Sequence, residues 1–329
     1  MIRIIAEVAQ GYEGRADYCR LYVKAAAKAG ADAVKFQIVY ADDVAEPGYR
    51  YYDWYRQLEM DVAVWREVRS LSRELGLALF TDVSGDRALS VAEQIVPDGI
   101  KIHSSNFFNR TLIRRAFDAA DRVFVSIGGI ELAEAEAFVA EARQWGVLDR
   151  LAFLYGFQSE PTPVETSMLS RLPLLKDHLG VEVGYLDHVD GLSPDRVMIS
   201  AMAMALGADW IEKHLTLSRY LEIEDFVSAL EPEEFADYVA TLRRLFAALG
   251  PAELTLTAAE RGYREKAVKK ILAARDLPAG CELAGDDMTL RRTDRVKPGQ
   301  GLYDPASLRG RRLKRAVAGG DPILTSDVE

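Results

Sequence analysis

Short apolar runs alternate with segments of helical periodicity along the first 250 residues of the chain. The runs predict eight strands, at Arg3–Val8, Ala33–Ile38, Leu77–Asp82, Gly99–His103, Arg122–Ile127, Leu151–Gly156, Val181–Leu186 and Asp209–His214. Apolar residues at helical spacing fall between them, as at Asp17–Ala29, Val62–Leu75, Ala133–Trp145 and Asp195–Leu206. Two Gly-Ala-Asp links join a predicted helix to the next strand, with glycine closing the helix.

This alternation predicts an α/β fold. Strand starts that are roughly 30 residues apart are typical of βαβ units. Eight such units favour a (β/α)₈ TIM barrel, with a doubly wound open sheet as the alternative. No G-x-G-x-x-G motif follows the first predicted strand, which counts against a dinucleotide-binding sheet.

The pattern changes after Gly250, where a helix predicted over Glu231–Leu249 ends. We expect a barrel domain over residues 1–250, a linker over 251–267 and a small, mostly β domain over 268–329. Short runs with turn signals, such as "KKILAARDLPAGCEL", indicate the last of these. Basic residues outnumber acidic ones over 261–315, so this domain either covers an anion site or presents a solvated basic face.

Composition narrows the class of protein. The 329 residues are 49% hydrophobic and 28% charged, an ordinary globular mixture. A net charge of −10 argues against a nucleic-acid-binding surface. The two cysteines, Cys19 and Cys281, lack metal-ligand spacing and fit a reducing cytoplasm. The start, MIRIIAEVAQ, lacks signal-peptide features, and no apolar run of about 18 residues predicts a membrane span.

Polar residues stand at the carboxyl ends of all eight predicted strands, where a parallel barrel places its active site. They are Glu7, Lys35, Gln37, Thr81, Asp82, Lys101, His103, Ser104, Ser126, Tyr155, Gln158, Asp187, His188, Glu212 and His214. Any one of them could be a structural polar group. Their repetition at every strand end predicts a functional site.

Lys35 and Lys101 lie within apolar strands, and a buried lysine is costly unless it is paired or meets an anion. Three interpretations remain open. The lysines pair with Glu7 or Glu212, they face a phosphate or carboxylate, or one of them forms a Schiff base.

His188 and His214 end neighbouring predicted strands. Adjacent strands lie about 4.8 Å apart, so the two imidazoles could bind one ion, with Glu7 beside them once the barrel closes. Nitrogen ligands favour a transition metal. The alternative is a pair of hydrogen-bonded histidines.

Several segments, taken together, resemble the sialic acid synthase family. They occur in that family's order: "IIAEVAQGYEG", "GADAVKFQ", "YDWYRQLEM", "KIHSSN", "SEPTPVE", "VGYLDHVDG", "GADWIEKHLTL" and "EDFVSALEPEEF". The stretch "AARDLPAGCEL…DDM…RVKPGQGL" resembles the antifreeze-like, or SAF, domain of that family. The resemblance covers nearly the whole chain.

The resemblance implies an enzyme that condenses phosphoenolpyruvate with a sugar aldehyde, giving a 2-keto-3-deoxy sugar acid and phosphate. It implies a domain-swapped homodimer and a divalent metal on His188 and His214, manganese first, with magnesium, cobalt or zinc as alternatives. The implied catalytic residues are Glu7, Lys35 and Lys101. The substrate-binding set that we expect is Gln37, Thr81, Ser104, Asn106, Ser126, Gln158, Glu160, Asp187, Glu212, Asp225 and Lys297.

Departures from the family motifs fall mainly on the sugar side. Asn106 stands where the family usually has glutamate, Glu160 where it has tyrosine, Leu186 where it has serine and Lys297 where it has arginine. We therefore expect conserved phosphoenolpyruvate chemistry and an acceptor other than N-acetylmannosamine. The alternatives are a metal-free Schiff-base aldolase and a catalytically impaired sugar-binding or regulatory homologue.

Overall fold

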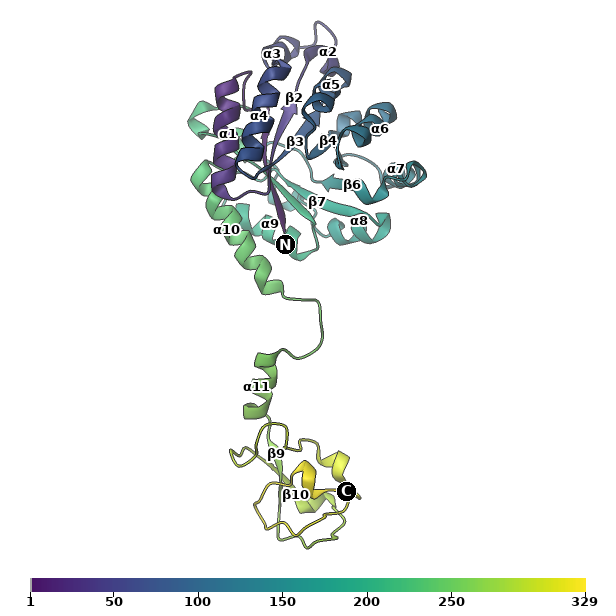
Figure 1. The fold of residues 1–329 in the computed structure, drawn as a ribbon, viewed down its shortest axis with the longest axis vertical. Coiled ribbons are helices and arrows are strands. Elements are labelled where there is room, and N and C mark those ends of the chain that lie inside the picture. The colour runs from purple at the N-terminus through teal and green to yellow at the C-terminus, as the bar shows by residue number, and fades with distance from the viewer. Residues whose placement is uncertain (1) are drawn as a thin grey trace. The chain divides into compact units, whose positions relative to one another are not determined.

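The computed structural model describes residues 2–329, which divide into two units at Gly250/Pro251. The first unit is a closed barrel of eight parallel strands with helices around it (Figure 1). The strands are β1 (Arg3–Ala9), β2 (Ala33–Ile38), β3 (Ala78–Val83), β4 (Gly99–Ile102), β5 (Arg122–Ser126), β6 (Leu151–Tyr155), β7 (Glu182–Asp187) and β8 (Trp210–His214).

Closure of the barrel confirms the predicted (β/α)₈ fold and excludes the open sheet. The strands follow one another in chain order around the barrel, and β8 pairs with β1 from Arg3↔Trp210 to Glu7↔His214. Every predicted strand is present, with its ends shifted by one residue at most. The apolar runs located the strands well because both faces of each strand are covered.

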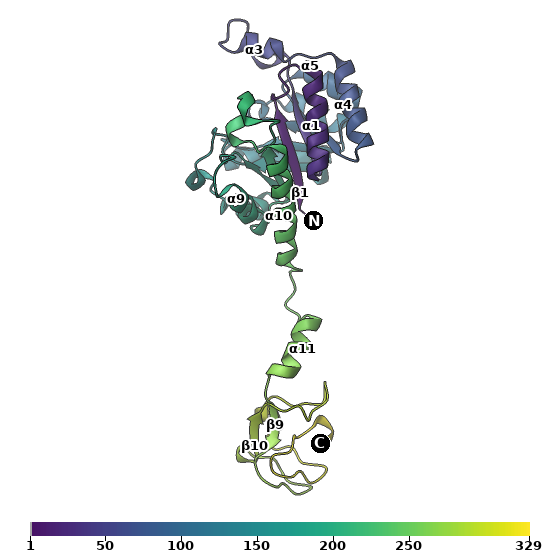
Figure 2. The ribbon, with the colours of Figure 1, turned by 90° about the vertical axis from the view of Figure 1, so that its left-hand side faces the viewer.

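Helices surround the barrel and leave the strand ends open to loops (Figure 2). They are α1 (Ala16–Ala29), α2 (Ala41–Val44), α3 (Tyr52–Gln57), α4 (Val62–Glu74), α5 (Asp86–Ile95), α6 (Arg110–Ala119), α7 (Leu132–Trp145), α8 (Arg171–Leu179), α9 (Arg196–Ala205) and α10 (Pro232–Leu249). Short 3₁₀ helices are η1 (Ser104–Asn106), η2 (Leu148–Arg150), η3 (Val164–Thr166), η4 (Arg219–Leu221) and η5 (Phe226–Ser228). Gly30 ends α1 in the left-handed region, at φ 78°, as the sequence predicted. The first and last helices, α1 and α10, pack side by side.

Inside the barrel, an apolar layer fills the lower half. Phe80, Phe124 and Trp210 pack edge to face or tilted, with centroid separations of 4.9–5.8 Å. Side chains alternate along a strand, so the next inward positions on β3 and β8 are Asp82 and Glu212. Both carboxylates are buried, and they mark the change from a packing layer to a charged layer.

The second unit, Pro251–Glu329, has its own apolar core, which includes Ile271, Leu283 and Ile323. It contains α11 (Ala258–Ala267), β9 (Lys270–Ala273), β10 (Met288–Arg291), η6 (Gly285–Asp287), η7 (Pro305–Leu308) and η8 (Thr325–Asp327). Strands β9 and β10 pair antiparallel, and isolated bridges join the other segments. The stretch 251–267, expected as a linker, carries α11.

One local arrangement occurs twice in this second unit. Arg275 pairs with Asp287, which accepts the backbone N–H of Ala284 at 2.9 Å. Arg315 pairs in the same way with Asp327, which accepts the backbone N–H of Leu324 at 2.9 Å. The arginine of each pair thus holds an aspartate that accepts a backbone N–H three residues before it. Across residues 2–329, no helix combines the length and the apolar character needed to span a membrane.

Candidate active site

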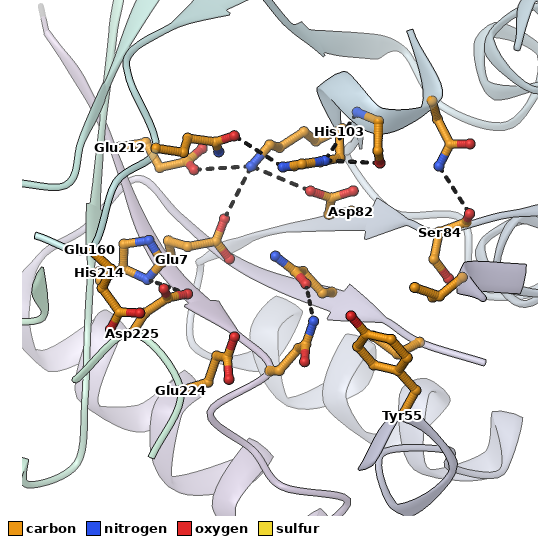
Figure 3. Close-up of a pocket in the computed structure, with 18 of the residues that line it drawn as sticks. Glu7, Tyr55, Asp82, Ser84, His103, Glu160, Glu212, His214, Glu224 and Asp225 are labelled. Carbon is orange, nitrogen blue, oxygen red and sulfur yellow. Dashed lines mark hydrogen bonds and ion pairs between the residues drawn. The ribbon is translucent and has the colours of Figure 1, made fainter. Parts of the chain in front are cut away.

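A cavity of about 490 Å³ opens where the barrel strands end (Figure 3). Its walls come from strand ends and from the loops that follow them. The lining residues are Glu7, Gln10, Gln37, Val39, Asp43, Val44, Tyr55, Asp82, Ser84, Lys101, His103, Ser105, Asn106, Gln158, Glu160, His188, Glu212, His214, Glu224 and Asp225.

Two lysines and three carboxylates form the floor of this cavity. Lys35 contacts Glu212, and its Nζ lies 2.8 Å from Glu7 Oε2. Lys101 Nζ lies 3.3 Å from Glu212 Oε1, 3.3 Å from Asp82 Oδ2 and 3.7 Å from Glu7 Oε2. None of the five side chains is more than 4% exposed. The pairing of both lysines with Glu7 and Glu212, one of the three interpretations of the sequence, is thus present in the structure.

Burial and ion pairing have opposite effects on the pKa values of the floor groups. Burial raises the pKa of Glu7 to about 7, against the opposing charge of Lys35. Burial would also raise the pKa of Glu212, but Lys101 and Lys35 outweigh it and lower that pKa. For Lys101 the charges of Glu212, Asp82 and Glu7 outweigh burial and raise the pKa, so its amine stays protonated. A protonated amine is a poor Schiff-base nucleophile.

His188 and His214 meet at the side of the cavity. Their Nε2 atoms are 3.2 Å apart, and burial lowers the pKa of each to about 3. Both rings are therefore neutral near pH 7, the form that binds metals. Two nitrogens bound to one ion at about 2.1 Å in tetrahedral geometry would be separated by about 3.4 Å. The observed spacing fits two ligands of one ion.

The surroundings of the pair also fit a metal with open positions. His188 Nδ1 is buried and has no hydrogen-bond partner within residues 2–329, while His214 Nδ1 lies 3.5 Å from Asp225 Oδ2. In the described part of the chain, no three His, Cys, Asp or Glu side chains gather closely enough to hold an ion. An ion on the two histidines would take its other ligands from water or substrate, as catalytic metals do.

A third histidine, His103, lines the opposite wall. Its Nδ1 accepts the N–H of Ser105 at 3.2 Å, and its Nε2 lies 3.0 Å from Gln158 Oε1. An Nδ1 acceptor leaves the proton on Nε2, which donates to Gln158. Burial lowers the pKa of His103, so the ring is a neutral donor to the cavity wall.

Carboxylates also dominate the rim. Glu160 and Glu224 are exposed at the mouth, and Asp225 lies deeper. Burial and the charges of Asp225 and Glu160 raise the pKa of Glu224 to about 7. Among the described residues that line the cavity, seven are carboxylates and one, Lys101, is an ammonium. The cavity is therefore strongly acidic.

Ten of the predicted site residues line the cavity: Glu7, Gln37, Lys101, Asn106, Gln158, Glu160, His188, Glu212, His214 and Asp225. Lys35 belongs to the floor cluster but lies behind the lining residues Glu7 and Glu212, and Lys297 belongs to the second unit. Ser104 starts η1 beside the lining residues Ser105 and Asn106, but does not itself line the cavity.

Three predicted substrate contacts lie outside the cavity, for reasons of strand geometry. Thr81 follows the inward-facing Phe80, so it faces the helices, and it is fully buried. Asp187 likewise faces outward, where it pairs with Lys213 at 3.0 Å. Ser126 is fully buried on the inward row above Phe124 and does not reach the cavity surface.

Sequence reasoning missed several lining residues. They follow the strand ends, either in loops or in the short helices α2, α3 and η1, and are Gln10, Val39, Asp43, Val44, Tyr55, Ser84, Ser105 and Glu224. Asp82 and His103 were recognised as strand-end residues but were given no role. Strand alternation with Phe80 would have selected Asp82 over Thr81.

The chain is similar to several known proteins. It is 28% identical to an uncharacterized protein of Methanocaldococcus jannaschii over 99% of this chain and 94% of that protein. It is 27% identical to a pseudaminic acid synthase of Campylobacter jejuni, over 98% and 96%. The solved N-acetylneuraminic acid (sialic acid) synthetase of Leptospira borgpetersenii, in complex with citrate, is 26% identical. It matches with a TM-score of 0.74 over 81% of this chain and 92% of that one.

Family patterns agree with the architecture. The NeuB family matches residues 22–253, which make up most of the barrel, and the SAF domain matches residues 271–329. The NeuB match ends three residues beyond the first unit, and the SAF match lies within the second. The chain belongs to the NeuB family, with a SAF domain at its C-terminal end.

Proposed function

We propose that this chain condenses phosphoenolpyruvate with a sugar aldehyde to give a 2-keto-3-deoxy sugar acid and phosphate. The observation that carries the proposal is the meeting, in one cavity, of a neutral histidine pair and the buried Lys35–Lys101 cluster. Family membership supports it, because named relatives include synthases of pseudaminic and sialic acids.

The residues divide the chemistry between them. C3 of phosphoenolpyruvate forms the new bond to the aldehyde carbon, whose oxygen takes a proton to become a hydroxyl group. Water then adds to C2, and cleavage of the C2–O bond releases phosphate and leaves a ketone. Glu7, with a pKa of about 7, takes the proton from that water. Lys101 and Lys35 offset the negative charges of the substrate.

A divalent metal fits His188 and His214, with manganese as our first choice. When bound, it supplies a Lewis acid for the aldehyde oxygen. The two histidines hold it, and Asp225 orients the His214 ring from the Nδ1 side.

The acidic cavity requires additional positive charge before it can bind the phosphoenolpyruvate anion. The seven carboxyl groups of the lining outnumber the ammonium groups of Lys101 and Lys35, so the cavity alone would repel that substrate. We propose that the metal supplies part of this charge and that Lys297, from a second copy of the chain in a domain-swapped dimer, supplies more. A variant ending at Gly250 should then bind phosphoenolpyruvate more weakly than the full chain.

The acceptor, we propose, differs from N-acetylmannosamine. Asn106 uses its amide to donate to Ser84 O at 3.0 Å, so it offers no carboxylate to the sugar. Glu160 brings a carboxylate to the rim instead. A site built for one set of hydrogen bonds rejects an analogue lacking them by about 10⁴-fold.

Phosphate release from phosphoenolpyruvate, measured with Mn²⁺ across a panel of aldoses and N-acylated amino sugars, tests the proposal. One or more sugars should give turnover, and N-acetylmannosamine should be a poor one. Comparable use of N-acetylmannosamine and the best sugar would refute the acceptor proposal. Absence of turnover with every sugar would refute the synthase proposal.

The metal ligands have a matched control. His188→Ala should lose bound Mn²⁺ and lower turnover by at least about 100-fold while the fold remains. His178→Ala removes an exposed histidine on α8 and should change neither. Full metal content and activity in His188→Ala would show that the ligand assignment is wrong.

The Schiff-base alternative gains no support from the floor geometry, because Lys101 is held in its protonated form. Borohydride reduction in the presence of substrate should leave the mass of the protein unchanged. A trapped adduct on Lys35 or Lys101 would favour the aldolase instead.

A further inference from the structure

A second charged group lies behind the histidine pair, on the outer side of the strands. Lys213 precedes His214 on β8, and Asp187 precedes His188 on β7. The two residues are direct cross-strand neighbours, and both are fully buried. Because Glu212 and His214 face the cavity, Lys213 faces the helices and cannot reach a substrate.

The contacts of this pair converge on the backbone around His188. Lys213 Nζ lies 3.0 Å from Asp187 Oδ1 and donates to the carbonyl of Val189 at 2.6 Å. The same carboxylate oxygen of Asp187 accepts the N–H of Val189 at 2.9 Å. Both backbone polar groups of the residue after His188 are thus held by one ion pair.

Two further contacts fix His188 itself. Its carbonyl accepts the Ser228 hydroxyl and the Thr162 N–H, each at 2.8 Å. On the helix side, Ser200 donates to Asp187, and the Tyr238 hydroxyl of α10 donates to Ser200 at 2.6 Å. The end of β7 is therefore tied to β8, α9 and α10 at once.

We propose that Lys213 is a positioning residue, which holds the ends of β7 and β8 so that the imidazoles of His188 and His214 keep the separation needed to share one ion. The inference rests on the metal site in the proposed function. Buried partners behind metal-binding histidines commonly change metal affinity by about 10–100-fold when they are removed.

The chain offers a matched control at the other end of β8. Lys176 pairs with Asp209 at 2.7 Å and donates to the carbonyl of Gly207 at 3.0 Å. This is the same chemistry, a lysine shared between an aspartate and a backbone carbonyl, but it lies before β8 rather than at its cavity end. Loss of Lys176 should affect folding stability without affecting the histidines.

The test titrates Mn²⁺ into the full-length chain and follows free ion by electron paramagnetic resonance. Lys213→Met should weaken Mn²⁺ binding by about 10–100-fold, and Lys176→Met should leave it unchanged. In Lys213→Met/Asp187→Leu, which removes both buried charges, thermal stability should recover while Mn²⁺ binding stays weak. If Lys213→Met does not fold, Ser200→Ala is measured instead. It removes only the hydrogen bond from Ser200 to Asp187 and should weaken Mn²⁺ binding to a smaller extent.

Two results would overturn the inference. One is Mn²⁺ affinity in the folded Lys213→Met protein equal to that of the parent. The other is recovery of affinity together with stability in the double variant, which would make the role structural only. If the parent binds no divalent ion, the metal proposal fails, and ring-nitrogen NMR of His188 and His214 decides the positioning role. Shifts in Lys213→Met but not in Lys176→Met support it, and unchanged spectra refute it.

Discussion

Trp210 and Glu212 are two positions apart on β8, and both point into the barrel, yet they belong to different environments. Trp210 packs edge to face on Phe124 at 4.9 Å in the lower layer, which is apolar. Glu212 lies in the upper layer and pairs with Lys35 and Lys101. The side chains of both layers are buried, so burial does not distinguish them.

What distinguishes the layers is the free energy of burial. An apolar side chain gains stability when it leaves water, at about 25 cal/mol per Å². An ion loses hydration that its partners only partly replace, and apolar residues of the same shape would often be at least as stable. Burial of the lower layer thus stabilises the fold, whereas the upper layer gains little from burial and has its explanation in the proposed function, within one set of strands.

Lys35→Met removes a positive charge from the upper layer and should have the largest effect on stability and turnover. It leaves Glu7 and Glu212 without their nearest counter-charge, which should lower the free energy of unfolding by about 3–5 kcal/mol. Turnover should fall by about 10³-fold, because a charge that stabilises the transition state is lost. Urea unfolding and phosphate-release kinetics measure the two effects. Undiminished kcat/KM would place the active centre elsewhere.

Phe124→Ala makes the converse change in the lower layer. The cavity it leaves beside Phe80 and Trp210 should lower the free energy of unfolding by about 3–5 kcal/mol. The protein that remains folded should keep its kcat/KM, since no charged contact changes. A loss of kcat/KM at temperatures where the variant is fully folded would contradict the division into layers.

The layers also show how far the sequence could predict the site. Short apolar runs located all eight strands, because parallel strands are covered on both faces. Lys35, Lys101 and Glu212 stood out as charges inside apolar runs. Thr81 was included through the family resemblance and Asp187 as a strand-end residue, and neither inference used alternation to ask which way the side chain faces.

The pH dependence of the unfolding free energy tests the contribution of Glu7, a member of the upper layer. Its pKa is about 7 in the folded protein and about 4.5 in the unfolded chain, so the folded state holds this proton more tightly. The stability that Glu7 contributes is then complete below pH 4.5 and is lost as the pH rises through 7. The unfolding free energy of the parent, relative to Glu7→Gln, should fall over that range by up to about 3 kcal/mol. A constant difference across the range would contradict this expectation.

Glu182, at the opposite end of the barrel, should respond to pH in the opposite sense and by the smallest amount. Burial would raise its pKa, but hydrogen bonds from Arg3 and Trp210 and the charge of Arg122 lower it. Its contribution is present above pH 4.5 and is lost as the pH falls through the lowered pKa. Glu182→Gln should cost less than about 1 kcal/mol at pH 7, because water screens this partly exposed group. If Glu182→Gln remained less stable than the parent at a pH below the lowered pKa of Glu182, this expectation would be contradicted.

The loops explain most of what the sequence could not predict. Tyr55 and Glu224 reach the cavity from α3 and from the segment before η5, and neither segment has a periodic pattern that gives its path. A hydrogen bond from Trp54 Nε1 of α3 to Gln10 Oε1, at 3.3 Å, helps to set the path of α3. Such contacts join residues that are far apart in the sequence and meet only in the folded chain.

The floor cluster has a consequence for how the chain is made. Glu7 and Lys35 can meet once β1 pairs with β2, whereas Glu212 lies 177 residues beyond Lys35 and arrives with the last strand. Until β8 leaves the ribosome, β1 and the newest strand remain open edges, which can pair with other chains. Insertion of β8 removes both edges and supplies the carboxylate shared by the two lysines. Closure of the barrel, protection from aggregation and assembly of the charged floor therefore coincide in a single strand.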